Sequence, residues 1–479
     1  MCINYKSIEK NHKSADEMKN IIIYGLFLLS CILLTSIASG QDASDNGNVK
    51  NFGAAGDGKK DDTDAIQKAV NAGTGIVYLS KGVYRITRPI VIDLDKVGYT
   101  SVKSEGGAWI VMAGSGPALR FIGTHYKSAD PSDFSQNVWD RQRMPFVDGV
   151  AIVGDHPDAI GIEAVGTMQL TISRIHVRGV LHGIHFVGNN RNVIISDCHI
   201  YENRGIGIYY DNVNLHQSNI TGCHISYNNG GGIVSRAGNV RNIQITGCDI
   251  ESNMSPDMLP TANVLIDRSG GSLGTGEVAI SGCTIQHDHT SPGSANIRII
   301  GSPNPDPNPE SVLKYNDYND NITITGNILS DVKVNIHLND CRDVTITGNT
   351  FWQGYTQNLL IEKCSNIVVG PNCFGSYKDS KTPEVKNGIK IINSEDCTFS
   401  GLHISNVLSE LAALLFDNCQ RINITNCTIL DYNNIGLLLK NVSYSRVSDC
   451  LIRDDRPNAN SIPMKIIGGK ENLIVDISK

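Results

Sequence analysis

Arg191-Asn-Val-Ile-Ile-Ser-Asp-Cys-His-Ile-Tyr-Glu-Asn203, His216-Gln-Ser-Asn-Ile-Thr-Gly-Cys-His-Ile-Ser-Tyr-Asn228 and Arg241-Asn-Ile-Gln-Ile-Thr-Gly-Cys-Asp-Ile-Glu-Ser-Asn253 superpose without a gap. Their cysteines, Cys198, Cys223 and Cys248, are 25 residues apart. A fixed period of about 20 to 50 residues, with short alternating apolar runs broken by Gly and Asn, is typical of a stacked β-coil. The sequence therefore predicts a solenoid.

The same pattern continues on both sides of these three segments. The cysteine position is taken by Ile175 upstream and, downstream, by Cys283, Asn327, Asn349, Asn372, Leu402, Cys427 and Cys450. A second short strand, such as Gly183-Ile-His-Phe-Val187, lies between successive copies. Side chains of such strands alternate between the inside and the outside. We therefore predict an all-β fold, a single-stranded right-handed parallel β-helix, because a left-handed hexapeptide coil would need a much shorter repeat.

Charge and length narrow the class of protein further. The 479 residues carry a net charge of −7, and the sequence pI is about 6.0. This balance gives no basic footprint for nucleic acid, which we exclude as a partner. The repeat runs without a linker to the end of the chain, so we expect one elongated domain rather than several.

The N-terminal segment predicts export. Residues 21–38 are almost uncharged and apolar, and they end in Ala38-Ser-Gly40-Gln41, which resembles a small-residue cleavage site. We predict a signal peptide over residues 1–40, whose true start is Met18 if the polar residues before it are not translated. Leu28-Leu-Ser-Cys31 resembles a bacterial lipoprotein box, so a lipid on Cys31 stays open as the one membrane contact, beside an uncleaved anchor. The predicted location is the periplasm, the extracellular space or, as a lipoprotein, the outer membrane of a bacterium.

Thirteen cysteines in an exported chain would usually suggest disulfides. Here the cysteines fall in columns, one through Cys198 and Cys223 and a second formed by Cys341, Cys364, Cys397 and Cys419. Stacked inward thiols behave as small buried hydrophobic groups, and parallel side-chain vectors are poorly set for bridging. We predict a ladder of reduced cysteines.

An amphipathic helix precedes the coils. Asp62 is a plausible N-cap, Ile66, Ala69 and Val70 share one face, and Gly73 ends the helix. Such a helix would cover the open end of a β-helix, whose edge otherwise invites aggregation. Residues 41–93 are therefore predicted to hold an N-terminal capping helix and the first coils.

The same stretch carries a resemblance to a known family. Asn51-Phe-Gly-Ala-Ala-Gly-Asp-Gly-Lys-Lys-Asp-Asp-Thr-Asp-Ala-Ile-Gln67, followed by Gly75-Ile-Val-Tyr-Leu-Ser-Lys-Gly-Val-Tyr-Arg-Ile86, resembles the N-terminal signature of the pectate-lyase-like superfamily. That group includes polygalacturonases, rhamnogalacturonan-active enzymes and phage tailspike depolymerases. The resemblance implies a right-handed β-helix and a carbohydrate substrate.

Insertions interrupt the regular coils of residues 94–479. They fall near residues 124–147, 254–277, 301–320 and 375–387. Insertions of this length are usually functional walls or lids. We therefore expect a groove beside the middle coils.

In polygalacturonases the catalytic acids lie between the cysteine-bearing strand and the next Gly-Ile strand, so the resemblance implies that a site would lie in the corresponding segments. The candidates for catalysis are Glu202, Glu251, Asp257, His287, Asp288 and His289. The candidates for substrate binding are His182, Arg204, Tyr227, Arg236, Arg298, Trp352 and Tyr355. Paired carboxylates could act as acid and base, and arginines could hold a uronate carboxylate. The same residues would also fit ordinary turns and solvated surface, and His199 and His224 would fit a stacked surface column.

The sequence departs from the polygalacturonase pattern, and this limits which roles the resemblance implies for these residues. The Asn-Thr-Asp, Asp-Asp and Gly-His-Gly motifs of polygalacturonases are missing, so we exclude an ordinary polygalacturonase mechanism. No residues have the closed spacing of a zinc site, and we predict neither a cofactor nor a metal site. A bound calcium ion remains an alternative, by analogy with pectate lyases.

The sequence thus predicts an exported enzyme that cleaves a polysaccharide in a groove along the β-helix. Either hydrolysis by a carboxylate pair or β-elimination by His, Arg or Tyr would fit the candidates. The alternative is a non-catalytic glycan-binding or surface solenoid, because a fold alone carries no activity. The chain would be a monomer or a trimer.

Overall fold

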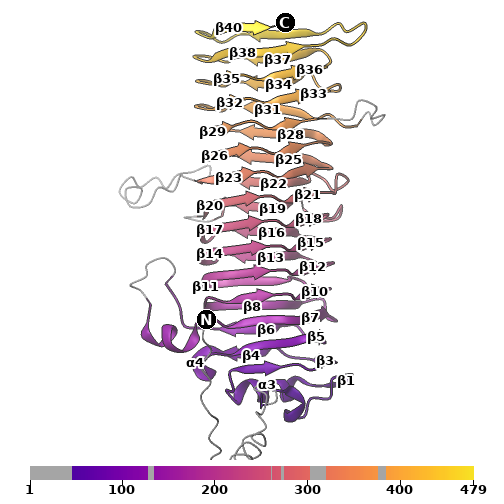
Figure 1. Cartoon of the computed structure of the whole chain (residues 1–479), viewed down its shortest axis with the longest axis vertical. Coiled ribbons are helices and arrows are strands. Elements are labelled where there is room, and N and C mark those ends of the chain that lie inside the picture. The colour runs from indigo at the N-terminus through magenta and orange to yellow at the C-terminus, as the bar shows by residue number, and fades with distance from the viewer. Residues whose placement is uncertain are drawn as a thin grey trace, which may run out of the picture. The chain divides into compact units, whose positions relative to one another are not determined.

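The computed structural model describes residues 46–127, 134–259, 261–270, 274–301, 320–375 and 384–478. Residues 47–479 form one unit by their contacts. Its strands pair in parallel, each coil on the next, from β1 to β40 (Figure 1). The predicted all-β, parallel β-helix is confirmed. The predicted signal peptide, Met18 and Cys31 lie outside the described residues, and in the described part no helix is long and apolar enough to cross a membrane.

The strands lie on three faces of the stack, which we number face 1 to face 3. Face 1 contains β4 (Ile90–Asp93), β6 (Gly116–Ile122), β8 (Ala159–Met168), β11 (Ile184–Ser196), β13 (Ile206–Asp211), β16 (Gly231–Arg236), β19 (Ala262–Asp267), β22 (Ala295–Ile300), β25 (Val332–Asn339), β28 (Gly354–Glu362), β31 (Gly388–Ile392), β34 (Ala412–Asp417), β37 (Ile435–Lys440) and β39 (Ile462–Ile467).

Face 2 contains β1 (Asp57–Asp61), β3 (Gly82–Ile86), β5 (Ser101–Met112), β7 (Phe146–Gly154), β10 (His176–Arg178), β12 (His199–Tyr201), β15 (His224–Ser226), β18 (Asp249–Glu251), β21 (Thr284–Gln286), β24 (Ile328–Ser330), β27 (Thr350–Phe351), β30 (Cys373–Phe374), β33 (His403–Ser405) and β36 (Thr428–Leu430).

Face 3 contains β2 (Ile76–Tyr78), β9 (Thr171–Ser173), β14 (Asn214–Thr221), β17 (Asn239–Thr246), β20 (Gly274–Ser281), β23 (Ile322–Thr325), β26 (Arg342–Thr347), β29 (Ser365–Val369), β32 (Thr398–Ser400), β35 (Asn423–Thr425), β38 (Arg446–Arg453) and β40 (Leu473–Ser478). The long strands β5, β7 and β38 begin on this face and continue onto face 2, and β11 begins on face 1 and continues onto this face.

The core is a column of inward β-branched side chains. Ile195 of β11 lies in register with Ile220 of β14, and Ile220 lies in register with Ile245 of β17, and all three are buried. Each such side chain contributes about 1.5–3 kcal/mol of hydrophobic stabilisation. The alternation of buried and exposed positions therefore fixes which residues of every coil face solvent.

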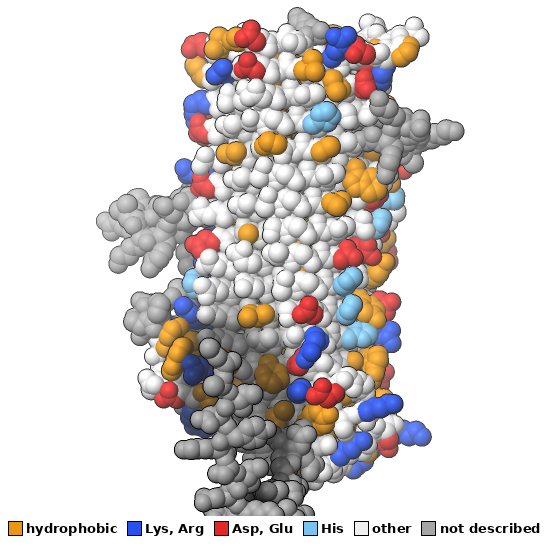
Figure 2. Space-filling view, viewed as in Figure 1, with side chains coloured by type: hydrophobic (Ala, Val, Ile, Leu, Met, Phe, Trp, Pro, Cys, Tyr) orange, Lys and Arg blue, Asp and Glu red, His pale blue; other side chains and the backbone are white. Residues whose placement is uncertain are grey.

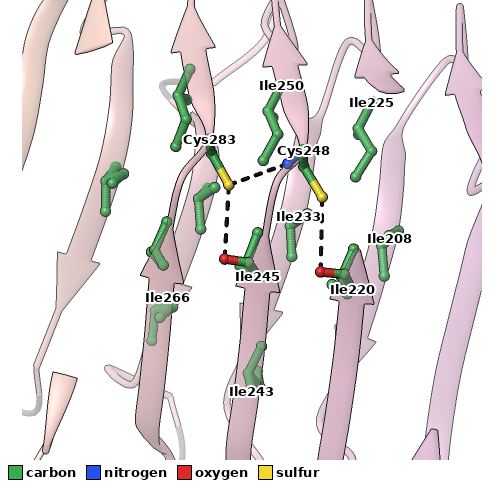
Figure 3. Close-up of a cluster of buried hydrophobic side chains, with 14 of the residues drawn as sticks. Ile208, Ile220, Ile225, Ile233, Ile243, Ile245, Cys248, Ile250, Ile266 and Cys283 are labelled. Atoms are coloured by element: carbon green, nitrogen blue, oxygen red, sulfur yellow. Dashed lines mark hydrogen bonds between the residues drawn. The ribbon is translucent and has the colours of Figure 1, made fainter. Parts of the chain in front are cut away.

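The predicted cysteine ladder is present and reduced. Cys198, Cys223, Cys248 and Cys283 are free and buried in successive coils. The Cys283 thiol lies 3.8 Å from the Ile245 carbonyl oxygen and accepts the Cys248 N–H at 3.5 Å (Figure 3). The thiols thus satisfy backbone groups inside the apolar core.

The second cysteine column differs from the prediction at one position. The Cys341 N–H is bonded to the Cys364 sulfur at 3.4 Å, and the Cys364 N–H is bonded to the Ser394 hydroxyl at 3.1 Å. Cys397 does not belong to this column, because Thr398 beside it pairs with Val368 and so places Cys397 next to Ile367. A serine hydroxyl can accept the same backbone N–H as a thiol. The position of this column could therefore not be found by following cysteines alone.

A ladder of buried asparagines runs along the stack, first in the turns between face 2 and face 1 and, from Asn263 to Asn358, within the face 1 strands. Each side-chain amide donates to the next along the series Asn203, Asn228, Asn253, Asn263, Asn296, Asn335, Asn358 and Asn387. The first three members were predicted to form a turn ladder, and that prediction is confirmed.

The predicted helix is α3 (Thr63–Asn71), which buries Ile66, Ala69 and Val70. Asp62 does not cap it, because its two carboxylate oxygens accept the N–H groups of Ala55 and Gly56 at 2.7 and 2.9 Å. That the helix closes the end of the stack stays a prediction. The other helical segments of the described residues include η1 (Val49–Phe52), α4 (Leu94–Val97) and η3 (Val138–Gln142), the last within the predicted insertion at 124–147.

Candidate functional site

A cluster of titratable side chains lies on the outer surface of face 1. Arg120, Glu163, His185 and Tyr209 occupy the same position in β6, β8, β11 and β13 and pair in register. Adjacent parallel strands are about 4.8 Å apart, so these side chains are brought together whatever their distance in sequence. We call this group, together with His182, Asp211 and Arg236, the face 1 cluster.

Opposite charges alternate through the face 1 cluster. Arg120 Nε lies 2.9 Å from one oxygen of Glu163, and the other Glu163 oxygen lies 3.5 Å from His185 Nδ1. His185 Nε2 lies 3.1 Å from Asp211 Oδ2. Asp211 is followed in the next coil by Arg236, which lies in register with it and continues the alternation of charge. The Asp211 side chain keeps 40% of its surface exposed, whereas the Glu163 side chain keeps 12%.

The pKa shifts follow from this arrangement. The contact with His185, with the Arg120 charge in support, holds the pKa of Glu163 below its usual value against the effect of burial. Burial alone would lower the pKa of His185, but its contacts with Glu163 and Asp211 raise it overall. The imidazole is therefore biased toward its charged form, which lies between the two carboxylates.

His182 has the opposite character. Its ring lies 5.4 Å from the His185 ring and 5.1 Å from the Tyr209 ring, measured between centroids. Burial, helped by the charge of His185, lowers the pKa of His182 to about 4. Its Nδ1 accepts the Ile206 N–H at 3.2 Å, so the neutral ring carries its proton on Nε2. Two neighbouring histidines thus differ in charge because only one of them has carboxylate partners.

Tyr209 completes the cluster as a protonated phenol. Its ring stacks on His185 with centroids 5.3 Å apart, and burial together with the Asp211 charge raises the pKa of its hydroxyl group. The face 1 cluster therefore offers one partly exposed carboxylate, two neutral proton donors and an exposed guanidinium. Such a set can remove a proton from carbon, protonate a leaving oxygen and hold an anionic group.

Only His182 and Arg236 of the sequence-predicted residues belong to the face 1 cluster. Arg120, Glu163, His185, Tyr209 and Asp211 were not predicted. The sequence contained a usable signal, because each of the first four follows a buried Leu or Ile at the same place in its strand. Aligning the outward position of these strands would have collected them.

Several predicted residues lie on the turn column between face 2 and face 1. Glu202, Tyr227 and His287 all adopt a positive φ, of 52°, 56° and 53°. Glu202 lies 3.7 Å from Arg178, and the Tyr227 hydroxyl group donates to Glu251 at 3.1 Å. This left-handed conformation recurs in turns throughout the described coils, so it belongs to the repeat rather than to one site.

Other predicted residues are engaged in local structure. Glu251 also accepts a bond from Gln286 at 3.0 Å, and Asp288 accepts the Thr290 N–H at 2.8 Å. Asp257 is exposed in a turn of the insertion, where its N–H donates to Ser255 at 3.3 Å.

The predicted arginines Arg204 and Arg298 contact backbone. Arg204 donates to the Pro157 carbonyl oxygen at 3.2 Å. Arg298 donates to the Thr261 and Gly293 carbonyl oxygens at 2.9 and 2.5 Å, and so ties two loops together. Its guanidinium is therefore committed to structure rather than to a ligand.

A small aromatic group brings two more predicted residues together. The rings of His289 and Tyr355 stack with centroids 3.9 Å apart, and the Lys333 ammonium group lies 6.0 Å from the Tyr355 ring. Trp352 lies half-buried in the next turn, where its carbonyl oxygen accepts a bond from Asn335 at 3.2 Å.

The predicted surface column of His199 and His224 is present on face 2. Their rings stack with centroids 5.1 Å apart, and His224 lies 3.7 Å from Asp249 of the next coil. Burial, with the Glu251 charge in support, raises the pKa of Asp249. Over the described residues no three His, Cys, Asp or Glu side chains are grouped as a metal site would require.

Three protein families match parts of the chain. The family described as rhamnogalacturonase A/epimerase, pectate lyase-like, matches residues 47–102, and the right handed beta helix region matches residues 146–285. The periplasmic copper-binding protein family NosD matches residues 277–409. The chain is a right-handed parallel β-helix of the pectate-lyase-like superfamily, as its N-terminal signature implied.

Curated relatives match over short segments. Alginate lyase 7 of Azotobacter vinelandii is 49% identical over 76 residues, which are 15% of this chain and 8% of that protein. The mannuronan C5-epimerase AlgE3 of the same organism is 45% identical over 76 residues, or 15% of this chain and 4% of that protein. The match thus spans less than a tenth of either relative.

Solved structures share the fold over most of the chain. The tailspike protein of E. coli bacteriophage HK620, in complex with a pentasaccharide, superposes with a TM-score of 0.55 and 11% identity over 91% of this chain and 79% of that chain. The mannuronan C-5 epimerase AlgE4 A-module of Azotobacter vinelandii has a TM-score of 0.44 and 15% identity over 88% of this chain and 99% of that chain. At 11% identity, the HK620 tailspike superposition shows that the two chains share the β-helix fold.

Proposed function

We propose that this protein is a polysaccharide lyase that cleaves a chain at a uronate unit by β-elimination on face 1. The observation that carries the proposal is the face 1 cluster, in which a partly exposed carboxylate lies beside two neutral proton donors and the exposed guanidinium of Arg236. In such a reaction a base removes the C5 proton of the uronate, a C4–C5 double bond forms, and the C4–O bond to the neighbouring sugar breaks.

Each step has a residue in the cluster. Asp211 accepts the C5 proton, because its contact with His185 holds it in place while much of its surface stays exposed. Arg236, one coil further, binds the uronate carboxylate and so favours loss of the C5 proton. The Nε2–H of His182 donates to the same carboxylate as negative charge develops on it. Tyr209 gives its phenolic proton to the departing oxygen and regains one from solvent.

The charge states argue against hydrolysis at this cluster. A hydrolase needs one carboxylic acid that is protonated near neutral pH, which requires a raised pKa. The pKa of Glu163 is lowered instead, and its oxygens face Arg120 and His185. The matches to an alginate lyase and to a mannuronan epimerase agree with chemistry at a uronate, although they cover short segments.

A two-channel assay tests the proposal. The full chain is incubated with alginate, polygalacturonate and neutral polysaccharides, and the ultraviolet absorbance of unsaturated uronate is followed together with reducing ends. We expect both signals to rise in parallel on one uronate polymer, and Asp211→Asn to lower both rates at least about 100-fold. Asp417→Asn is the matched control, because Asp417 ends a face 1 strand in the way that Asp211 does but pairs with Lys440.

Other outcomes of this assay would replace the proposal. Deuterium uptake from heavy water at C5 without chain cleavage would indicate an epimerase. Binding without reaction would indicate a glycan-binding solenoid. Reducing ends without absorbance would indicate hydrolysis, for which the raised pKa of Asp249, beside Glu251 on face 2, is the observation in favour.

A further inference from the structure

A second site is suggested by a groove on face 3, away from the face 1 cluster. One hollow of about 590 Å³ is lined by residues that include Phe146, Thr171 and Ile194 of β7, β9 and β11. A second hollow of about 360 Å³ is lined by residues that include Asn219 of β14 and Gln244 of β17. The two hollows share Asn192 and Ile194, so they form one groove along the stack.

The groove carries no charge that is free to balance a ligand's charge. Its charged lining residues are Asp148 and Arg174, and they pair with each other through two hydrogen bonds, one of them 2.8 Å long. The other lining residues carry amide, hydroxyl or apolar side chains. Figure 2 shows few charged side chains along the middle of the face turned to the viewer. A surface of this length without charge is unusual in a chain with 19% charged residues.

The polar and apolar groups of the groove match those of a sugar. Met144 and Ile194 expose 63% and 41% of their surface and offer apolar contact for C–H groups. The amides of Asn219 and Gln244, in register on adjacent coils, offer both donors and acceptors. The amide oxygens of Gln169 and Asn192 are buried and accept no hydrogen bond from any described residue.

We infer that the groove on face 3 is a carbohydrate-binding site that takes a segment of neutral sugar units lying along the stack. An acidic chain is disfavoured there, because the Asp148–Arg174 pair leaves no cation for its carboxylates. The groove differs in this respect from the face 1 cluster, where Arg236 is exposed. Because β11 carries His185 on face 1 and Ile194 on face 3, the two sites lie on different faces joined by one strand. This binding does not depend on the reaction proposed for face 1.

Affinity electrophoresis of the full chain tests this inference. The protein is run in native gels that contain a soluble glucan, mannan, xylan or galactan, and in gels that contain alginate. We expect at least one neutral polysaccharide to retard the protein. The double variant Asn219→Ala/Gln244→Ala should weaken that retardation at least about tenfold, because it removes the hydrogen bonds of both amide side chains to the sugar.

Two matched variants make the result decisive. Asn423→Ala changes an outward asparagine of face 3 that lies outside the groove, and it should bind as the unmodified protein does. Asp211→Asn should also leave the retardation unchanged, whatever it does to activity. The inference is overturned if no neutral polysaccharide retards the protein. It is equally overturned if the double variant binds like Asn423→Ala, or if Asp211→Asn abolishes binding.

Discussion

The imidazole of His185 bridges two carboxylates, with Nε2 3.1 Å from Asp211 and Nδ1 3.5 Å from Glu163. A cation between two anions stabilises both, whereas a neutral group of the same size would leave them to repel each other. His185 therefore acts as a positioning residue that orients Asp211. The four members Arg120, Glu163, His185 and Asp211 come from four successive coils, so the β-helix itself sets the alternation of charge.

The first prediction concerns this bridge. Replacing His185 by Gln should lower the rate of uronate cleavage about 10- to 100-fold, because Asp211 loses its partner and its orientation. Since His185 does not touch the substrate in our mechanism, kcat should fall while KM changes little, and the pH optimum should move. An unchanged pH profile alongside a lower rate would instead indicate that His185 has only a structural role.

The second prediction is a loss of stability at alkaline pH that depends on His185. The pKa of His185 is raised in the folded protein, so its stabilising contribution is complete below the ordinary value of about 6.5 and is lost as the pH rises through the folded value. The gap in urea midpoint between the unmodified protein and His185→Gln should therefore shrink as the pH is raised from 6 to 9. A gap that widened over this range would contradict the assignment.

The third prediction has the opposite sign and concerns His182. Its folded pKa of about 4 lies below the unfolded value of about 6.5, so the unfolded state takes up a proton first as the pH falls. His182 should thus cost up to about 3 kcal/mol of stability between pH 6.5 and pH 4. His182→Gln should be relatively more stable at pH 4.5 than at pH 7.5, measured by urea unfolding. Nuclear magnetic resonance titration of the ring proton provides a second check on the same group.

The fold could be predicted from the sequence because its information repeats. Cys198, Cys223 and Cys248 are equally spaced, and each is followed two residues later by a buried isoleucine. A wrong register assigned to one coil would therefore conflict with the pattern of the next coil. The buried column also accepts different side chains, since Asn327 takes the position of Cys283 in the next coil and accepts the Cys283 N–H. The one misplaced member, Cys397, lies in the first coil after an insertion, where the period no longer fixed the register.

The site was harder to predict because it is formed across coils and not along them. His182 and Arg236 were found as single residues, yet their neighbours Glu163, His185 and Asp211 become a cluster only when strands of different coils are aligned. The candidates predicted from the turns include Glu202 and Tyr227, which adopt the left-handed conformation that the repeat requires. The charge states of the two histidines depend on burial and partners, which spacing alone does not give.

The fourth prediction uses the cysteine ladder. Among the described cysteines only Cys373 is exposed, and the others are buried and free. Hydrogen bonding to Cys223, together with burial, raises the pKa of Cys248 to about 11, so this thiol stays protonated at neutral pH. Iodoacetamide at pH 7.5 should label Cys373 rapidly in the folded protein and the ladder cysteines only after unfolding. Peptide mass spectrometry distinguishes the sites, and rapid labelling of Cys248 in the folded state would contradict the packing.

The fifth prediction tests the asparagine ladder at Asn228. Its amide donates to Asn253 at 2.7 Å and to the Ile200 carbonyl oxygen at 3.1 Å, while its own oxygen accepts from Asn203 at 2.7 Å. Asn228→Ala would leave these buried partners without a bond, and each unsatisfied group costs about 1–3 kcal/mol, so we expect a loss of about 2–4 kcal/mol in the free energy of unfolding. The exposed neighbour Asn229 is the matched control, and Asn229→Ala should stay within about 0.5 kcal/mol. Because coils contact mainly their neighbours, hydrogen exchange should speed up most in the coils around residue 228. Equal destabilisation by the two variants would show that the ladder contributes no more than an ordinary surface amide.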